Sequence, residues 1–566
     1  MPAIDCQALL DRIRLAEMQR LLSRFSALHR LTGQPAAEQA GRYIIEQLTA
    51  YGIDCELYEF DGYFSDPLSG ELRAGKPAAR IDAKPRSFSA NCPEGISGTV
   101  IYDRHSRSRL TPLEEDAWFR QFQGKVVLSW NFYEDYVKKI EAYGAIGLIH
   151  IWGSGEEALH EETVGPVWGT PTPDSIGWLP AIPVLGIRQA DGLRLIRQAE
   201  AGDLPVTLRS RVENHVAKAF LPVARIAGKT DEYVLVSGHY DSWHEGVTDN
   251  AVGNAVCLEL ARIFAAYAGK LERGVRIAWW PGHSNGRYMG SAWFCDNQWQ
   301  DLNRHCIGHL NIDSPGSCGG TTVLPRTSRL EGDSLLPELI GALTGLTPQQ
   351  LLDIPRGADQ SFWGVDIPFH MMFKYQPPPD QQLYQSPGSG GGWWWHTEHD
   401  TIDKVDDELL LRDARLNAAT VFALAAPKRL PADFGAYFAW LETRLRELAG
   451  EADPAFDFQP ILAGLTALSR QISLLADTVD DTRFNRLVKR AGGRLHGLVY
   501  SAGSRYDFDN AFPAKPFPSL QRVALLRRDQ TPAAQFLFAR TAFIRQRNRL
   551  IHEMNALSAE LTALLS

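Results

Sequence analysis

The chain has 566 residues, a formal net charge of −9, and 44% hydrophobic against 22% charged residues. This composition is typical of a folded soluble protein, and the length predicts about three domains because one hydrophobic core rarely serves so many residues. The negative charge disfavours nucleic acid and anionic membranes as partners. The N-terminus lacks the features of a signal peptide, no apolar run approaches the ~20 residues of a membrane span, and the seven cysteines form no CxxC pair. We therefore expect a cytoplasmic protein with reduced thiols.

The pattern of apolar residues divides the chain into four segments. Residues 1–85 alternate helical and strand-like patterns, which is typical of an α/β unit. Residues 86–212 contain short strand patterns between Gly- and Pro-rich turns and predict a separate β-rich module. Strands and helices alternate again over residues 213–430, which predicts a mixed, mostly parallel sheet flanked by helices. Residues 431–566 are dominated by helical spacing and predict a helical domain.

Potential metal ligands follow three apolar strands of the third segment. His239 comes after "YVLVSG", His283 comes after "VRIAWWPG", and Asp313 closes "IGHLNID". Because reactive groups in open α/β sheets collect at the carboxyl ends of the strands, we expect these side chains to lie close together. Imidazole and carboxylate groups are the ligands that suit zinc and its divalent neighbours. The sequence therefore predicts a site for one or two Zn²⁺ ions, or for another divalent metal, at this edge of the sheet.

Two further ligands and one supporting residue lie near these strand ends. Asp249 stands at the start of the helix after His239, where its two carboxylate oxygens would allow it to bridge two cations. His396 follows a Gly-rich loop that we expect to fold back over the same edge. Asp241, two residues beyond His239, is placed to accept the second N–H of that imidazole. Taken singly, Asp249 is most simply a helix N-cap, so the prediction depends on the joint placement of these residues.

Several of these stretches resemble a known family. "GHYDSWHEGVTDNAVGNAVCLELAR", "HLNIDS" and "WWWHTEHDT" are similar, in the same order, to the motifs of the M28 co-catalytic metallopeptidases, especially the branch of glutamate carboxypeptidase and transferrin receptor. The resemblance implies a zinc-exopeptidase-like fold, with a protease-associated (PA) domain inserted over residues 86–212. It also implies that residues 431–566 form a dimerisation domain, so we expect a homodimer.

The resemblance further implies a ligand set. His239 and Asp313 would bind one metal, and Asp249 would bridge it to a second metal that His396 holds. In that family a Glu-Glu pair after the next strand supplies one more ligand and the general base.

This chain departs from the family at the Glu-Glu pair. In "WWPGHSNGRYMGS", His283 and Ser284 stand where the two glutamates are expected. Because neutral imidazole binds zinc well, we expect His283 to replace the missing ligand. Glu245 and Glu398, both close in sequence to ligands, are the candidates to carry the proton, and Asp241 completes the predicted catalytic set.

The expected reaction is metal-assisted attack of water on an amide, in a peptide or a small N-acyl amino acid. We expect Arg287 and Arg356 to bind a substrate carboxylate. Trp395, which stands where the family has a phenol, is expected to line the pocket and to donate a hydrogen bond if its indole points inward. The motifs do not distinguish an aminopeptidase from a carboxypeptidase.

Two other classes of function stay open at this point. "GHSNG", residues 282–286, fits the G-x-S-x-G pattern of a serine hydrolase, in which Ser284, Asp359 and His396 would follow the expected chain order. That interpretation leaves three potential metal ligands unexplained. The missing Glu-Glu pair would also suit a non-catalytic binding protein, although a buried ligand set without a function would cost stability.

Overall fold

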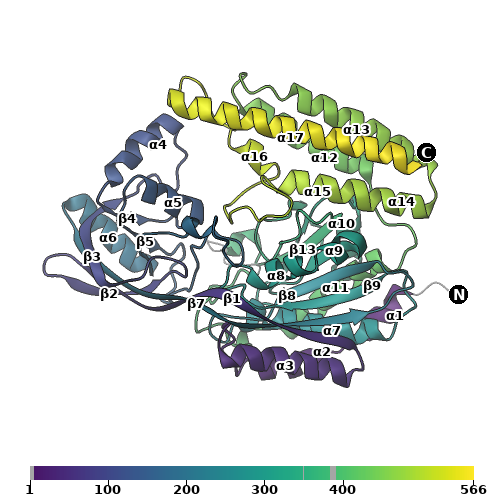
Figure 1. The fold of residues 1–566 in the computed structure, drawn as a ribbon. Helices are drawn as coiled ribbons and strands as arrows, with labels where there is room; N and C mark the ends of the chain where they lie inside the picture. Colours follow the sequence, from purple (N-terminus) through teal and green to yellow (C-terminus); the bar gives the residue numbers. More distant parts are fainter. Residues whose placement is uncertain (1–4, 349, 383–389, 566) are drawn as a thin grey trace.

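The computed structural model describes residues 5–348, 350–382 and 390–565. It consists of an α/β core, a β-rich lobe beside the core, and a helical region that lies along one side of both (Figure 1). One sheet of 13 strands runs through core and lobe in the order β1-β2-β6-β5-β4-β3-β7-β9-β8-β10-β13-β11-β12. The predicted fold class, a mixed and mostly parallel sheet flanked by helices and followed by a helical region, is confirmed.

The core half of the sheet contains the strands that precede the predicted ligands. β8 (Tyr233–His239), β9 (Gly274–Trp280), β10 (Cys306–Asn311) and β13 (Phe369–Gln376) are parallel. On the two sides of this group, β7 (Pro205–Ile226) is antiparallel to β9 and β11 (Thr322–Thr327) is antiparallel to β13. At the edge, β12 (Leu352–Asp353) pairs parallel with β11. Every residue of β8 is buried, as expected for a parallel strand that is covered on both faces.

Helices cover both faces of the core sheet because its strands are apolar on both sides. Val234 and Val236 belong to the hydrophobic cluster of one face, and Tyr233 and Leu235 to the cluster of the other. The first face is covered by α2 (Leu15–Phe25), α3 (Pro35–Ala50), α7 (Val252–Ala265) and α11 (Asp407–Ala425). The second face is covered by α8 (Met289–Asn297) and α9 (Trp299–His305). Two shorter helices, α1 (Cys6–Leu10) and α10 (Leu335–Thr344), pack beside α11.

The β-rich lobe shares two long strands with the core. β1 (Asp54–Ala74) and β7 pair antiparallel along almost their whole length and extend from the core into the lobe (Figure 1). The other lobe elements are β2 (Ala79–Pro85), β3 (Cys92–Tyr102), β4 (Val126–Ser129), β5 (Gly147–Ile151), β6 (Val184–Ile187), α4 (Pro112–Phe119), α5 (Glu134–Ala142) and α6 (Gln189–Ala201). The boundaries expected at residues 85 and 212 fall at the end of β2 and within β7, and the division into four domains stays a prediction.

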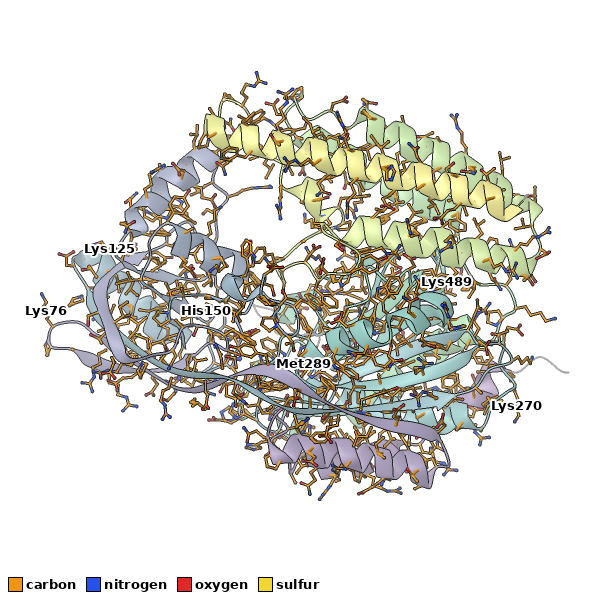
Figure 2. The ribbon with its side chains drawn as sticks, in the orientation of Figure 1. Lys76, Lys125, His150, Lys270, Met289 and Lys489 are labelled. Atoms are coloured by element: carbon orange, nitrogen blue, oxygen red, sulfur yellow. The ribbon has the colours of Figure 1, made fainter. Side chains whose placement is uncertain are left out.

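The helical region packs on the core through its own helices and one half-buried lysine. It contains α12 (Phe434–Glu451), α13 (Gln459–Thr478), α14 (Asp481–Leu487), α15 (Gly493–Tyr500), α16 (Pro518–Gln521) and α17 (Ala533–Leu565). Lys489, labelled in Figure 2, donates hydrogen bonds to the backbone carbonyls of Leu302, Cys306 and Asp366 at 3.2, 2.6 and 2.8 Å. These bonds tie the helical region to the α9–β10 connection of the core. Among the described helices, none combines the length and apolar character that crossing a membrane requires.

Candidate metal centre

Four predicted ligands meet at the carboxyl edge of the core sheet. His239 is the last residue of β8, and Asp313 follows β10. The Nε2 atom of His239 lies 2.9 Å from Oδ1 of Asp249 and 3.9 Å from Oδ1 of Asp313, while Nε2 of His396 lies 3.1 Å from Oδ2 of Asp249. Each oxygen of Asp249 therefore faces a different imidazole, which is the arrangement that a bridging carboxylate requires.

The backbone around Asp249 explains why its carboxylate is available. Asp249 is not the cap of α7, because the side chain of Asn250 accepts the N–H of Gly253 at 3.1 Å instead. The carboxylate of Asp400 accepts the N–H groups of Thr248 and Asp249 at 2.8 and 3.1 Å and so holds the turn before the helix. Burial raises the pKa of Asp400 to about 7, although these hydrogen bonds oppose the shift. The sequence analysis did not predict this role of Asp400. The only feature that could have indicated it is its position four residues after the predicted ligand His396.

The chemistry of this group fits a divalent cation. Ligand atoms of His239, Asp249 and Asp313 all lie within 4.8 Å of one another, and their side chains are almost fully buried. Within the described part of the chain, Nε2 of His239 and Oδ1 of Asp249 have no hydrogen-bond partner, although the two atoms lie only 2.9 Å from each other. Buried polar atoms without partners are costly, and a cation between them would satisfy both. When no cation is bound, burial raises the pKa of Asp249, but the two facing imidazoles outweigh burial and hold this pKa well below its usual range.

Backbone carbonyls orient both imidazoles toward Asp249. The Nδ1–H of His239 donates to the main-chain carbonyl of Asp241 at 3.0 Å, and the Nδ1–H of His396 donates to the carbonyl of Glu161 at 3.0 Å. Each bond leaves the Nε2 lone pair facing the centre, as a metal ligand requires. The side chain of Asp241, predicted to hold His239, instead accepts the N–H groups of His283 and Ser284 at 3.1 and 2.9 Å, although its Oδ1 remains 3.6 Å from Nδ1 of His239.

The loop that carries His396 is held by the lobe. The N–H of Glu161 donates to the carbonyl of His396 at 2.9 Å, which completes a two-bond pairing between these residues. Next to it, Nδ1 of His160 lies 2.6 Å from the carbonyl of Trp395, and the His160 ring stacks on Trp152 with centroids 3.8 Å apart. A ligand of the core is therefore positioned by residues of the lobe, a contact that the sequence analysis did not foresee.

His283 lies beside the four ligands but has a separate environment. Its ring stacks on His239, with centroids 3.8 Å apart. Its Nδ1 lies 2.7 Å from Oδ2 of Asp359, which is completely buried and also accepts the hydroxyl of Ser291 at 2.9 Å. Because a carboxylate accepts, Nδ1 carries the proton and Nε2 is left as the acceptor. His283 is not among the residues whose ligand atoms lie within 4.8 Å of one another.

The remaining predicted residues are spread around this centre. Glu398 is exposed and Glu245 is half-buried. Arg287 forms a buried ion pair with Glu134, and the indole of Trp395 stacks on the His396 ring with centroids 3.4 Å apart.

The predicted serine triad is not assembled. Asp359 contacts His283 and Ser291, and His396 contacts Asp249. Within the described residues, no hydrogen bond joins Ser284 to His396.

A buried arginine near the N-terminus supports the loop after β8. The guanidinium of Arg30, which is completely buried, donates to the carbonyls of Tyr240, Glu245 and Gly246 at 2.9, 2.7 and 2.9 Å. These bonds satisfy backbone groups of the loop that leads from His239 to Asp249. The sequence contains no local signal for this role, because Arg30 lies some 210 positions from the loop it holds.

Two hollows open beside the centre. The larger, about 420 Å³, is lined by residues of the lobe, the core and the helical region. The smaller, about 210 Å³, is lined by Asp249 and Asp313 among others. His283, Tyr288, Pro355 and Trp395 line both hollows, so a substrate in either one would lie against the centre.

Comparison with known proteins relates this site to a family. The sequence model of peptidase family M28 matches residues 223–421. Carboxypeptidase Q of Xenopus laevis is 26% identical over 297 residues, covering 48% of this chain and 57% of that protein. Aminopeptidase YwaD of Bacillus subtilis (strain 168) is 25% identical over 297 residues, covering 51% of this chain and 58% of that protein. The chain thus spans less than two thirds of the length of these relatives.

Solved structures show the same fold. An aminopeptidase from Aneurinibacillus sp. strain AM-1 superposes with a TM-score of 0.57 at 21% identity, covering 75% of this chain and 97% of that one. BSAP, a zinc aminopeptidase from Bacillus subtilis, superposes with a TM-score of 0.55 at 18% identity, covering 74% and 98%. At these identities the likeness concerns the fold alone. The segment 223–421, which the sequence model of peptidase family M28 matches, supplies His239, Asp249, Asp313 and His396.

Proposed function

We propose that the protein is a metal-dependent exopeptidase that hydrolyses amide bonds in peptides or N-acyl amino acids, with zinc as its metal. The observation that carries the proposal is the position of Asp249 between His239 and His396, with buried ligand atoms that lack partners within the described chain. The names of the relatives, which include aminopeptidases, a zinc aminopeptidase and carboxypeptidases, support the same reaction class.

In this proposal, the residues have distinct tasks. His239 and Asp313 hold one ion, Asp249 bridges, and His396 holds a second. Zinc supplies Lewis-acid polarisation of the amide carbonyl and lowers the pKa of water. The carbonyls of Asp241 and Glu161 hold the two imidazoles in the tautomer that leaves Nε2 as a ligand.

We assign the proton acceptor to His283 rather than to Glu245 or Glu398. His283 lines both hollows beside the centre, and its bond to Asp359 leaves Nε2 able to accept a proton there. Glu398 is exposed, and neither glutamate lines the two hollows. The absent Glu-Glu pair is thus replaced by an imidazole that a buried carboxylate orients.

The test combines metal content with hydrolysis of a panel of dipeptides and N-acyl amino acids. Protein purified without added metal or chelator should contain about two divalent ions per chain. His239→Ala should lose metal and all hydrolysis, and full activity in that variant would overturn the proposal. His283→Ala should keep its metal and lose activity, whereas a fall toward one ion would show that His283 is a ligand and would overturn its assignment as proton acceptor.

Three finer features belong to the same proposal. We propose that the lobe is a PA-like domain, which is supported by its contacts with the His396 loop. We propose a homodimer through the helical region, which is supported by exposed Leu537, Phe538 and Ile544 on α17. A Phe538→Asp variant that remains a dimer in sedimentation analysis would contradict that interface. We propose a cytoplasmic location because all seven cysteines are free thiols.

A further inference from the structure

The side chain of Tyr288 belongs to the walls of both hollows beside the metal centre. The smaller hollow is also lined by the predicted ligands Asp249 and Asp313. Only 7% of Tyr288 is exposed, and its ring meets the ring of His283 edge-on, with centroids 5.0 Å apart. A substrate in either hollow would therefore lie against this phenol.

The backbone holds Tyr288 in one position at the start of α8. Tyr288 is the N-cap of that helix and has a φ of 63°, in the left-handed region. Bulky residues seldom adopt this conformation, and where they do it is often at a functional site. The carbonyl of Tyr288 accepts the hydroxyl of Ser291 and the N–H of Ala292, both at 3.1 Å. Its ring packs on Trp168, with centroids 4.5 Å apart.

Two donors face the phenol oxygen of Tyr288. Arg287 donates from Nη1 at 3.2 Å, and the backbone N–H of Ala358 faces the same oxygen. A phenol oxygen accepts through its lone pairs and donates through one hydrogen, so these contacts leave the hydrogen for another partner. Among the described residues, none accepts a hydrogen bond from this hydroxyl. Because Ala358 lines the smaller hollow, the hydroxyl lies at the border of that hollow.

The guanidinium of Arg287 is fixed beside the phenol by a buried ion pair. Its Nη2 pairs with Glu134, and its central carbon lies 4.8 Å from the centroid of the Tyr288 ring. Arg287 was expected to bind a substrate carboxylate, as was Arg356, which pairs with Asp509 at 3.1 Å instead. Burial raises the pKa of Tyr288 although Arg287 opposes the shift, so the hydroxyl keeps its proton at neutral pH. A hydroxyl that already accepts from a cation is polarised and becomes a stronger donor.

We propose that Tyr288 is a catalytic residue that donates a hydrogen bond to the carbonyl oxygen of the scissile amide. The inference rests on the proposed function of the metal centre. In that reaction water adds to the carbonyl carbon, the π electron pair moves to the oxygen, and Nε2 of His283 takes one proton of the water. That proton then goes to the amine nitrogen as the C–N bond breaks. Tyr288 keeps its own proton and stabilises the negative oxygen before the carbonyl re-forms.

The test compares Tyr288→Phe with the wild type on dipeptides and N-acyl amino acids. The variant removes the hydroxyl and keeps the ring, so kcat should fall about 10²- to 10³-fold, while KM and metal content stay near those of the wild type. Tyr233→Phe is the matched control. Tyr233 is also buried and its hydroxyl donates to Asp301 at 2.6 Å, but it lies at the opposite end of β8 from His239. This control should leave kcat unchanged.

Binding of two inhibitors separates catalysis by the hydroxyl from a change in packing. A phosphinic dipeptide carries a tetrahedral anionic group in place of the amide, and its inhibition constant should rise in Tyr288→Phe by about the factor that kcat/KM falls. A reduced dipeptide, in which CH₂ replaces the scissile carbonyl, lacks that oxygen and should bind both proteins equally. 3-Fluorotyrosine at position 288 keeps the hydroxyl and should retain most of the wild-type kcat.

The outcomes divide between this inference and the proposed function. A kcat for Tyr288→Phe within about threefold of the wild type would overturn the role of Tyr288. Equal weakening of both inhibitors, or a loss of activity with 3-fluorotyrosine as large as with phenylalanine, would also overturn it, because packing rather than the hydroxyl would then be responsible. Absence of hydrolysis of every substrate by metal-loaded wild type would instead overturn the proposed function.

Discussion

The contact between His283 and Asp359 predicts a specific effect of the variant Asp359→Asn. Asp359 is completely buried, and its Oδ2 lies 2.7 Å from Nδ1 of His283. An asparagine amide has nearly the same shape but donates where the carboxylate accepts. If the amide donates to Nδ1, the imidazole proton moves to Nε2, and His283 can no longer accept a proton from the site. The variant therefore changes the tautomer without removing a side chain.

The structure allows the effects of Asp359→Asn on stability and on activity to be estimated. A charge-assisted hydrogen bond to a buried group contributes about 1.5–3 kcal/mol, and asparagine retains part of it, so the free energy of unfolding should fall by no more than about 2 kcal/mol. Asp359 has a φ of 57°, in the left-handed region that asparagine also tolerates, so no backbone strain is added. Activity should fall far more, by about 10²- to 10⁴-fold in kcat, because an imidazole in the wrong tautomer cannot serve as the base.

The assay is steady-state hydrolysis beside urea unfolding and elemental analysis of metal. Ser291→Ala is the matched control, because it removes the other partner of Asp359 at 2.9 Å and leaves the bond to His283 in place. That control should lose less than about tenfold in kcat. A kcat for Asp359→Asn within threefold of the wild type, in a folded and metal-loaded protein, would refute the role given to this pair.

Three further variants test other contacts. His160→Phe should keep the stacking on Trp152 but lose the hydrogen bond to the Trp395 carbonyl. Its affinity for metal, measured by competition with a chelator, should therefore fall about tenfold. An unchanged affinity would argue that the lobe does not support the metal centre. Arg30→Met should reduce the free energy of unfolding by about 3–5 kcal/mol in urea, because three loop carbonyls lose their donor; a loss below about 1 kcal/mol would contradict this. Burial raises the pKa of Glu331 from 4.5 to about 7. The folded state therefore binds a proton more tightly than the unfolded state, and stability falls as pH rises from about 4.5 through 7. Between pH 5 and pH 8 the free energy of unfolding of Glu331→Gln should fall by on the order of 3 kcal/mol less than that of the wild type. Parallel profiles of unfolding free energy against pH for the two proteins would refute this.

Much of the fold was predictable because the signals are local. The strands β8, β9 and β10 are short, mostly apolar runs that end in a polar residue or are followed by one within a few positions, and the helix α7 follows from its apolar spacing. Once the sheet was expected to be parallel, His239 and Asp313 had to lie at one edge. The lobe and the helical region also differ from the core in their local patterns. The boundary between core and lobe was harder to predict from the sequence, because β1 and β7 run through both without interruption.

The sequence by itself determined the strand ends and therefore the first half of the site, since periodicity and strand termini are properties of neighbouring residues. Only the tertiary structure decided the other half. His396 is oriented by Glu161, 235 residues away, and His283 by Asp359, 76 residues away. Arg287 and Arg356, which were expected to bind substrate, form ion pairs with Glu134 and Asp509. Each of these contacts joins segments far apart in the chain, and it exists only because the sheet and the lobe bring them together; such pairing leaves no periodic trace in a single sequence.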